Sequence, residues 1–352
     1  MNAKQVKEVK TLLSTPKNIV IVTHWSPDGD AMGSSLGLYN YLIQKKHKVT
    51  VIAPNEYPSF LFWLPGNKKV VDFTADPKVA KAAVAKANIV FCLDFNSLKR
   101  INALGDEVGK SKALKFIIDH HLQPDDFADY MLHDVKACST CELIYDFIEL
   151  LEDKKCLNKD IANCLYTGIM TDTGSFRFPS TTSKTHRIIA ELIECGAENA
   201  AIHGKIYDDN TEDKLRLLGY CLSEKLTVFK EYHTAFFNLR GDELRRYNYR
   251  KGDTEGLVNY ALSIEGICFA AFFVERNGIV KTSFRSKGSF NVNVFARKHF
   301  NGGGHANAAG GMSELTLDES IIKFVSLLAE NKEELSLSCA APKTSIKKKV
   351  KK

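Results

Sequence analysis

Short apolar runs alternate with helical patterns along the first half of the chain. The runs cover residues 18–24 (NIVIVTH), 48–53 (KVTVIA), 88–94 (NIVFCLD) and 114–119 (LKFIID). Helical patterns separate them, notably an amphipathic segment over 30–45 and an alanine-rich segment over 77–87. Strands that are apolar at nearly every position are typical of parallel sheets with helices on both faces. The alternation therefore predicts an α/β domain built on a parallel sheet.

The pattern changes near residue 196. A loop-rich stretch is followed by a leucine-patterned helix over 211–225 and then by strand-like runs over 233–239, 267–275 and 279–285. Asn277 and Gly278 lie between the last two runs, and this pair is a strong signal for a hairpin turn. With a helix expected over 291–300, the second half predicts a smaller, mixed-sheet α/β domain. The expected boundaries are 1–195 for the first domain, 196–228 for a linker helix region, 229–338 for the second domain and 339–352 for a disordered basic tail.

Three of the four N-terminal strands end in a side chain that binds metals. They deliver His24, Asp94, and Asp119 with His120. In open α/β sheets, sites form beyond the carboxyl ends of the strands, so we expect these groups to lie at one edge.

More acids follow in THWSPDGDAMGSS and YTGIMTDTGSFRF. Asp28 and Asp30 flank a glycine at the expected start of a helix. Helix capping accounts for one such acid, but clustered carboxylates repel one another unless a cation neutralises them. Asp172 follows an apolar helix that we expect to end near Met170, and we place it in a loop as a further candidate ligand.

These groups predict a pair of divalent cations. Four aspartates supply four negative charges, which two divalent ions balance. Mixed oxygen and imidazole ligation suits manganese, with magnesium, cobalt, iron or zinc as alternatives. Paired ions polarise a phosphoryl group and generate a hydroxide nucleophile near neutral pH. The aspartates are Asp28, Asp30, Asp94 and Asp172, and the imidazoles are His24 and His120.

The stretch FNGGGHANAAGG suggests a phosphate-binding loop in the second domain. The consecutive residues Gly302, Gly303 and Gly304 let backbone amides approach a ligand, and amides above a helix start suit phosphate. His305 is a candidate donor to phosphate or sugar. Arg285 ends a strand and is expected to reach the same substrate, because guanidinium groups recognise phosphate strongly. A flexible glycine linker is the alternative.

Together these motifs resemble those of the DHH phosphoesterase superfamily. The similar segments are DGD at 28–30, Asp94 after an apolar strand, DHH at 119–121 and TDTGSFRF at 171–178. GGGHANAAGG at 302–311 resembles the signature of the DHH-associated domain, and EGLVNYALSIEG at 255–266 resembles the nanoRNase and 3′-phosphoadenosine 5′-phosphate phosphatase branch. The resemblance spans about residues 5–335.

The resemblance implies a role for each residue. One ion would be held by His24, Asp28 and Asp94, and the other by Asp30, Asp94, His120 and Asp172, with Asp94 bridging. Asp119 would orient its neighbours, and His121 would face the substrate phosphate, so that the implied catalytic residues are Asp94, Asp119, His120 and His121. The implied substrate-binding residues are Arg285, Gly302, Gly303, Gly304 and His305, across an active-site cleft between the two domains.

The implied reaction is metal-dependent phosphoester hydrolysis by a two-metal-activated hydroxide. The expected substrates are very short oligoribonucleotides, cut to mononucleotides, and 3′-phosphoadenosine 5′-phosphate, cut to AMP. The alternatives are an inorganic pyrophosphatase or exopolyphosphatase of the same superfamily, or a non-catalytic dinucleotide-binding protein. The sequence leaves open the preferred substrate, the native metal, the direction of cleavage and the oligomeric state, for which a homodimer is one possibility.

Composition changes this interpretation little. The chain has 352 residues, and its net charge of +6 comes largely from six lysines in the last eleven residues, PKTSIKKKVKK. That tail either favours polyanions or is a solubilising end. No apolar run is long enough to span a membrane, and the start has no apolar signal-peptide core. We therefore expect the nine cysteines to be reduced thiols of a cytoplasmic protein.

Some signals favour ordinary structural roles. Cys138 and Cys141 form a C-x-x-C motif, but Ser139 and Glu142 predict a helix capping box there. Trp63 is expected to pack, whereas for Trp25, next to His24, packing and stacking on a nucleobase are equally favoured. The remaining histidines are expected to be ordinary surface or core residues; they are His47, His133, His186, His203, His233 and His299.

Overall fold

The computed structural model describes residues 1–276 and 278–340. The chain divides into two compact units, Met1–Asp209 and Asn210–Lys352. Asn277 of the predicted hairpin turn, and the predicted basic tail from residue 341 onward, lie outside the described residues.

The N-terminal unit is built on a six-stranded sheet in the order β3-β2-β1-β4-β5-β6. Every neighbouring pair of strands is parallel. The sequence prediction of a parallel sheet is therefore confirmed. The strands are β1 (Asn18–Val22), β2 (Lys48–Ala53), β3 (Val70–Asp72), β4 (Ile89–Leu93), β5 (Leu114–Asp119) and β6 (Tyr130–His133).

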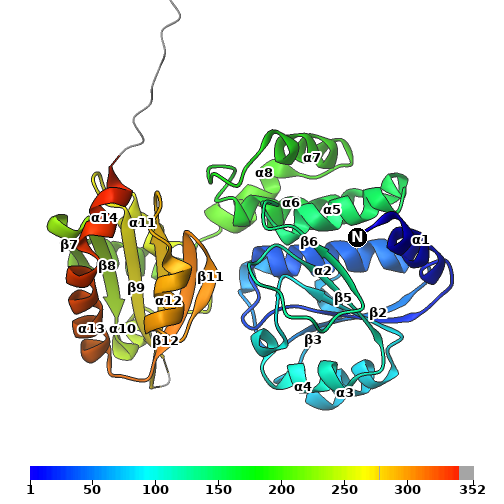
Figure 1. The fold of residues 1–352 in the computed structure, drawn as a ribbon, viewed down its shortest axis with the longest axis horizontal. Helices are drawn as coiled ribbons and strands as arrows, with labels where there is room; N and C mark the ends of the chain where they lie inside the picture. The colour runs from blue at the N-terminus through cyan, green and yellow to red at the C-terminus, as the bar shows by residue number, and fades with distance from the viewer. Residues whose placement is uncertain (277, 341–352) are drawn as a thin grey trace, which may run out of the picture. The chain divides into compact units, whose positions relative to one another are not determined.

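Helices cover both faces of this sheet (Figure 1). The helices α2, α5 and α6 lie over one face, and α3 and α4 lie over the other. The helices of the unit are α1 (Ala3–Leu12), α2 (Gly29–Gln44), α3 (Pro77–Lys86), α4 (Ala103–Lys110), α5 (Thr140–Leu150), α6 (Lys159–Asp172), α7 (Ser183–Glu194) and α8 (Asn199–His203), with a short 3-10 helix η3 (Leu98–Ile101) after β4.

Successive residues of the central strands enter opposite cores. In β1, Ile19 and Ile21 pack in the cluster beneath α2, α5 and α6, while Val20 and Val22 pack against α3 and α4. Side chains alternate across a strand, so a sheet that is buried on both faces needs an apolar residue at every position. This explains the near-continuous apolar runs.

The C-terminal unit contains a second six-stranded sheet in the order β11-β12-β10-β9-β8-β7. Only β8 and β9 pair in parallel, and the other neighbours are antiparallel, which confirms the predicted mixed sheet. β9 and β10 form the expected hairpin, since Ile279 pairs with Arg276. The strands are β7 (Leu226–Phe229), β8 (Thr234–Leu239), β9 (Phe269–Arg276), β10 (Ile279–Ser286), β11 (Gly303–His305) and β12 (Ala308–Ser313).

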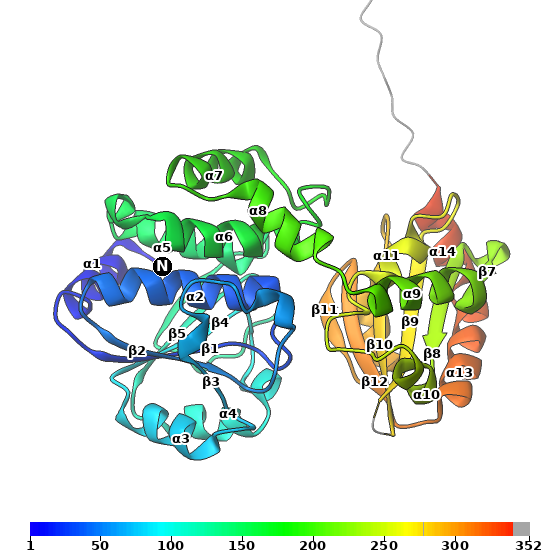
Figure 2. The same cartoon turned by 180° about the vertical axis from the view of Figure 1, so that it is seen from behind.

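This sheet also has a core on each face. A phenylalanine-rich cluster joins it to α12, α13 and α14, and a second cluster joins it to α9, α10 and α11 (Figure 2). These helices are α9 (Glu212–Tyr220), α10 (Gly241–Arg246), α11 (Leu257–Leu262), α12 (Val292–His299), α13 (Leu317–Glu330) and α14 (Lys332–Cys339). Among the described residues, no helix has both the length and the apolar character needed to cross a membrane.

Candidate metal centre and substrate-binding residues

The carboxyl ends of β1, β4 and β5 meet at one edge of the N-terminal sheet. The parallel ladder continues past the last strand residue of β4, since the Asp94 amide donates to the Ile118 carbonyl of β5 at 3.1 Å. His24 follows β1, and His120 follows β5 directly. Strand register therefore brings together side chains that are almost a hundred residues apart in the sequence.

A first group of donors consists of His24, Asp28 and Asp94. His24 Nε2 lies 3.3 Å from Asp94 Oδ2 and 3.8 Å from Asp28 Oδ1. His24 Nδ1 lies 2.9 Å from the Trp25 carbonyl oxygen. A carbonyl oxygen only accepts, so Nδ1 holds a proton and Nε2 is the nitrogen that faces the carboxylates. One ligand atom from each residue lies within 4.8 Å of the others, which is compact enough to hold a cation.

A second group consists of Asp30, His120 and Asp172. His120 Nε2 lies 3.5 Å from Asp172 Oδ2 and 3.8 Å from Asp30 Oδ2, while its Nδ1 lies 3.2 Å from the Ala137 carbonyl oxygen. Asp172 is the last residue of α6, so its expected place in a loop was wrong. The helix continues two residues beyond Met170 and carries the carboxylate to His120.

Asp94 lies between the two groups. Its Oδ2 faces His24, and its Oδ1 lies 3.5 Å from His120 Nε2. Asp94 is buried and has a left-handed backbone with φ of +64°. Such backbone strain in a non-glycine residue is typical of functional sites. The two carboxylate oxygens therefore face different donor groups, as a bridging ligand requires.

Strained backbone recurs in the other loops at this edge. Ser26, Gln123, Ser175 and Phe176 all have φ between +55° and +64°. Each lies within four residues of a predicted ligand or of His121. The loops that hold the candidate site are therefore unusually constrained.

The N-terminus of α5 supports both donor groups, a role that the sequence analysis missed. The Thr140 amide donates to Asp30 Oδ2 at 2.6 Å, and the Cys141 amide donates to Asp30 Oδ1 at 2.9 Å. The Thr140 hydroxyl donates to Asp94 Oδ1 at 2.9 Å. Charge-assisted hydrogen bonds of this kind fix the orientation of carboxylates.

The capping prediction at α5 was half right. Ser139 is the N-cap, and its hydroxyl accepts from the Glu142 amide at 3.1 Å. The Glu142 carboxylate instead accepts from the Cys138 thiol at 3.0 Å and from the Thr185 hydroxyl at 2.9 Å. The strong N-cap was the available signal that a helix start faces the site.

Asp119 and His121 form a buried pair, and His121 Nδ1 also lies 3.7 Å from Asp94 Oδ1. His121 Nδ1 lies 2.7 Å from Asp119 Oδ1, and the His121 amide donates to Asp119 Oδ2 at 3.1 Å. The His121 carbonyl lies 2.6 Å from His133 Nε2, a contact that sequence reasoning also missed. Asp119 therefore fixes the ring of His121, and His133 fixes its backbone.

The electrostatics of the cluster favour bound cations. Burial raises the pKa of Asp30 well above its ordinary value, and the charges of Asp94 and Asp172 raise it further. Burial also acts to raise the pKa of Asp94, but hydrogen bonds from His120 and His24 outweigh it and hold the pKa well below its usual range. Burial acts to lower the pKa of His24, yet its contacts with the aspartates raise that pKa to about 10. The ionised form of Asp30 is therefore favoured by additional positive charge nearby, and a donor set of carboxylate oxygens and imidazole nitrogens fits manganese or a similar divalent ion.

In the C-terminal unit, Arg285 and His305 lie close in the sheet. Arg285 of β10 and His305 of β11 both pair with Ala308 of β12, one on each side. They are therefore two strands apart, or about 10 Å between backbones. The structure thus brings together the two residues that the sequence predicted to bind substrate.

The glycine run does not stand above a helix start, so that part of the prediction was wrong. It follows the carboxyl end of α12 and enters edge strand β11. A Cβ on Gly302 would lie 2.0 Å from the Gly310 oxygen, and one on Gly304 would lie 2.5 Å from the Ala308 oxygen. Close packing against β12 therefore explains two of the three glycines. Around Gly303 the nearest atom would lie 3.5 Å away, so packing does not demand a glycine there.

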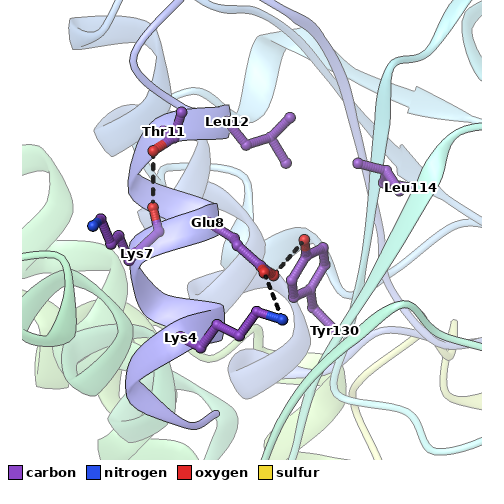
Figure 3. A pocket seen from close by; sticks show the side chains of 7 residues that line it. All are labelled: Lys4, Lys7, Glu8, Thr11, Leu12, Leu114 and Tyr130. Atoms are coloured by element: carbon purple, nitrogen blue, oxygen red, sulfur yellow. Dashed lines mark hydrogen bonds and ion pairs between the residues drawn. The ribbon is translucent and has the colours of Figure 1, made fainter.

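A surface pocket of about 560 Å³ lies elsewhere in the N-terminal unit (Figure 3). Residues of α1 line it together with Leu114 and Tyr130, the first residues of β5 and β6. In it, the Tyr130 hydroxyl donates to Glu8 at 3.3 Å. The pocket is therefore at the amino ends of the strands, opposite the edge that carries the predicted metal ligands.

The family is shown by two matching family models. The model described as the N-terminal domain of the DHH family matches residues 18–169, and the DHHA1 domain model matches residues 232–334. The chain therefore belongs to the DHH family of phosphoesterases, hydrolases that act on phosphoester bonds.

The curated relatives include the bifunctional oligoribonuclease and PAP phosphatase NrnA of Bacillus subtilis. It is 31% identical over 307 residues, which is 86% of this chain and 91% of the relative. The protein of the same name from Thermus thermophilus is also 31% identical, over 92% of this chain and 93% of the relative.

Solved structures agree with the fold. A crystal structure of an exopolyphosphatase-related protein from Bacteroides fragilis is 40% identical and has a TM-score of 0.89, covering 95% of this chain and 98% of the other. The exonuclease RecJ, solved bound to manganese, has a TM-score of 0.51 at 14% identity over 94% and 95% of the two chains, and it supports the fold alone.

Proposed function

We propose that this protein hydrolyses very short oligoribonucleotides to mononucleotides and 3′-phosphoadenosine 5′-phosphate to AMP, using two divalent ions, most favourably manganese. The observation that carries the proposal is the shared position of Asp94. One of its oxygens lies 3.3 Å from His24, and the other lies 3.5 Å from His120. The relatives named as oligoribonuclease and PAP phosphatase supply the substrate class.

The donors divide between two ions in this proposal. His24, Asp28 and Asp94 would hold one, and Asp30, Asp94, His120 and Asp172 would hold the other. Bound ions of this kind polarise a phosphoryl oxygen and make water a better nucleophile near neutral pH. Thr140 keeps Asp30 and Asp94 in position through its amide and hydroxyl.

His121 would contact the substrate phosphate. Asp119 orients the His121 ring through its contact with Nδ1 at 2.7 Å, and Nε2 of the oriented ring would bind or transfer a proton at a phosphate oxygen of the substrate. Arg285 and His305, with Gly302, Gly303 and Gly304, would hold the remainder of the nucleotide. The proposed division of labour gives chemistry to residues 1–195 and substrate binding to residues 229–338, joined through 196–228.

The test is one assay series with manganese. The substrates are a diribonucleotide, 3′-phosphoadenosine 5′-phosphate, pyrophosphate and a short polyphosphate, and the products are measured as mononucleotide or released phosphate. The proposal expects turnover of the first two that chelation abolishes and manganese restores. Turnover of the inorganic substrates alone, or of none, contradicts it.

A polyphosphate-hydrolysing function is the second candidate. It is favoured by the 40% identical structure described as exopolyphosphatase-related. A side-by-side assay of a diribonucleotide and a short polyphosphate separates the two functions, because the second candidate expects turnover of the polyphosphate alone.

The setting of the reaction is also part of the proposal. We place the protein in the cytoplasm, where its nine cysteines, all unpaired in the structure, would stay reduced. We also propose a homodimer, which light scattering after size exclusion tests directly.

A further inference from the structure

Trp25 has an unusual position for a large apolar side chain. It directly follows His24, so the two Cα atoms are about 3.8 Å apart. Its side chain is 37% exposed, although an indole gains free energy from burial. Trp63, the other tryptophan, packs against the core of the N-terminal unit.

The backbone around Trp25 is held from three sides. The Trp25 amide donates to the Arg100 carbonyl of η3 at 2.8 Å, and its carbonyl accepts from His24 Nδ1 at 2.9 Å. The next residue, Ser26, has a left-handed backbone, and its amide donates to the buried Asn55 side chain at 2.6 Å. The loop is therefore strained at Ser26 and fixed by hydrogen bonds, and it leaves the indole partly exposed directly after His24, a predicted metal ligand.

A rigid, half-exposed indole suits a flat aromatic ligand. Aromatic side chains stack on nucleobases, and such stacking tolerates any base because every base has a π-face. When the phosphate of a nucleotide is bound at the predicted metal ligands, the base of the same nucleotide lies only one ribose away from them. The indole beside His24 is thus within reach of a substrate base.

We propose that Trp25 is the stacking platform for a nucleobase of the substrate, a specificity-determining residue that makes the site favour nucleotides over inorganic phosphates. This inference rests on the proposed function, because it assumes a nucleotide at the donors. Asn55 is a positioning residue that holds the platform through Ser26.

The two tryptophans allow a direct binding test. In a Trp63→Phe protein, Trp25 is the remaining tryptophan and can be excited selectively over the tyrosines. The probes are AMP and ribose 5-phosphate, which differ by the base. Magnesium serves as the cation, since it does not quench fluorescence itself. AMP is expected to quench Trp25, and ribose 5-phosphate is expected to leave its emission unchanged. If Trp63→Phe does not fold, the difference between wild type and Trp25→Phe gives the same signal.

Affinities provide the second readout, from calorimetry on the full chain. Trp25→Ala is expected to weaken AMP binding by about 5- to 150-fold, the range for loss of one base stack, and to change ribose 5-phosphate binding by less than about twofold. Trp25→Phe, which keeps a ring, should fall between wild type and alanine. Asn55→Ala should weaken AMP selectively but by less than Trp25→Ala.

The controls separate this inference from the proposed function. Magnesium affinity of Trp25→Ala must match wild type, which shows that His24 is undisturbed. The stacking role of Trp25 is contradicted if Trp25→Ala weakens the binding of AMP and of ribose 5-phosphate equally, or if AMP binds without quenching Trp25 fluorescence. Either result leaves the proposed hydrolysis of short RNA unaffected. The proposed function is contradicted if the protein hydrolyses neither short RNA nor 3′-phosphoadenosine 5′-phosphate. In that case, the quenching of Trp25 fluorescence by AMP can still be measured.

Discussion

The two units assemble their functional side chains by different means. In the N-terminal unit, parallel strands end at a common edge, so residues that follow β1, β4 and β5 meet whatever the exact strand lengths. In the C-terminal unit, Arg285 and His305 meet because antiparallel register sets both opposite Ala308. A shift of one residue in that register would separate them, since side chains alternate between faces. In a parallel sheet, the residues of a site can therefore be predicted from where the strands end. In an antiparallel sheet, they can be predicted only if the pairing register of the strands is known.

Removal of Asp94 should have the largest effect, because both donor groups depend on it. Asp94→Ala is expected to lower turnover of a diribonucleotide by roughly 10³-fold or more, as loss of metal-centred charge stabilisation costs several kcal/mol. Calorimetry should also show weaker manganese binding. Asp76→Ala, which removes an exposed acid before α3, is the control and should match wild type. Full manganese affinity in Asp94→Ala would refute its bridging role.

Substitution of Arg285 tests the proposed substrate-binding role of the C-terminal unit. Arg285→Ala is expected to raise the KM for a diribonucleotide by about 10- to 150-fold, because hydrogen bonds to charged groups contribute about 1.5–3 kcal/mol. Manganese affinity should not change, since the predicted metal ligands belong to the other unit. Arg285→Lys should rescue only partly if phosphate recognition is bidentate. A fall in kcat with KM unchanged would contradict a binding role.

The sequence predicted residues at the ends of parallel strands, but it did not predict residues that are placed by tertiary contacts. His24, Asp94 and His120 were predicted as ligands because apolar runs that end in such residues are visible without any register, and the structure places these side chains together. Thr140 was missed because its partners are distant in the sequence: its amide, which any residue type supplies, donates to Asp30, and its hydroxyl donates to Asp94. His133 was missed because it contacts the His121 backbone, which leaves no sequence pattern.

The errors at Asp172 and at the glycine run have a common origin. The sequence TDTGSFRF contains loop-forming residues, yet α6 continues through Asp172 before the left-handed turn at Gly174. The glycine run was expected above a helix start, whereas it lies after α12 and against β12, which leaves no room for a Cβ on Gly302 or Gly304. In both cases the deciding contact lies in tertiary structure, which local composition does not contain.

Thr140 gives a finer test of how the N-terminal unit is held. Thr140→Val keeps the shape but removes the hydroxyl that donates to Asp94. Manganese affinity is expected to fall by about 10-fold, because groups that orient metal ligands typically contribute 10- to 100-fold. Thr140→Ser should restore it. The same loss in the serine variant would point to packing instead of the hydroxyl.

Manganese should stabilise one unit and not the other. At a concentration 100 times its dissociation constant, a ligand adds about 2.7 kcal/mol to the folded state. For a unit of this size, that corresponds to a rise in Tm of about 5–10 °C. Calorimetric unfolding should show the shift in the transition of the N-terminal unit alone, and Asp94→Ala should lose most of it. An equal shift of both transitions would contradict the assignment of all metal donors to one unit.

The glycine run offers the smallest but most selective test. Gly302→Ala and Gly304→Ala should destabilise the C-terminal unit by roughly 1–3 kcal/mol, because the added Cβ meets the backbone of β12. Gly303→Ala should change stability by less than about 0.5 kcal/mol, since its Cβ would be in ordinary contact with Asn293 and Arg297. Thermal unfolding measures the difference. If Gly303→Ala nevertheless raises the KM for a diribonucleotide, Gly303 is required for substrate binding. Gly302 and Gly304 would then serve packing, and the residue between them would serve binding. An unchanged KM would leave β12 as the sole reason for the run, and substrate binding in this unit would then depend on Arg285 and His305.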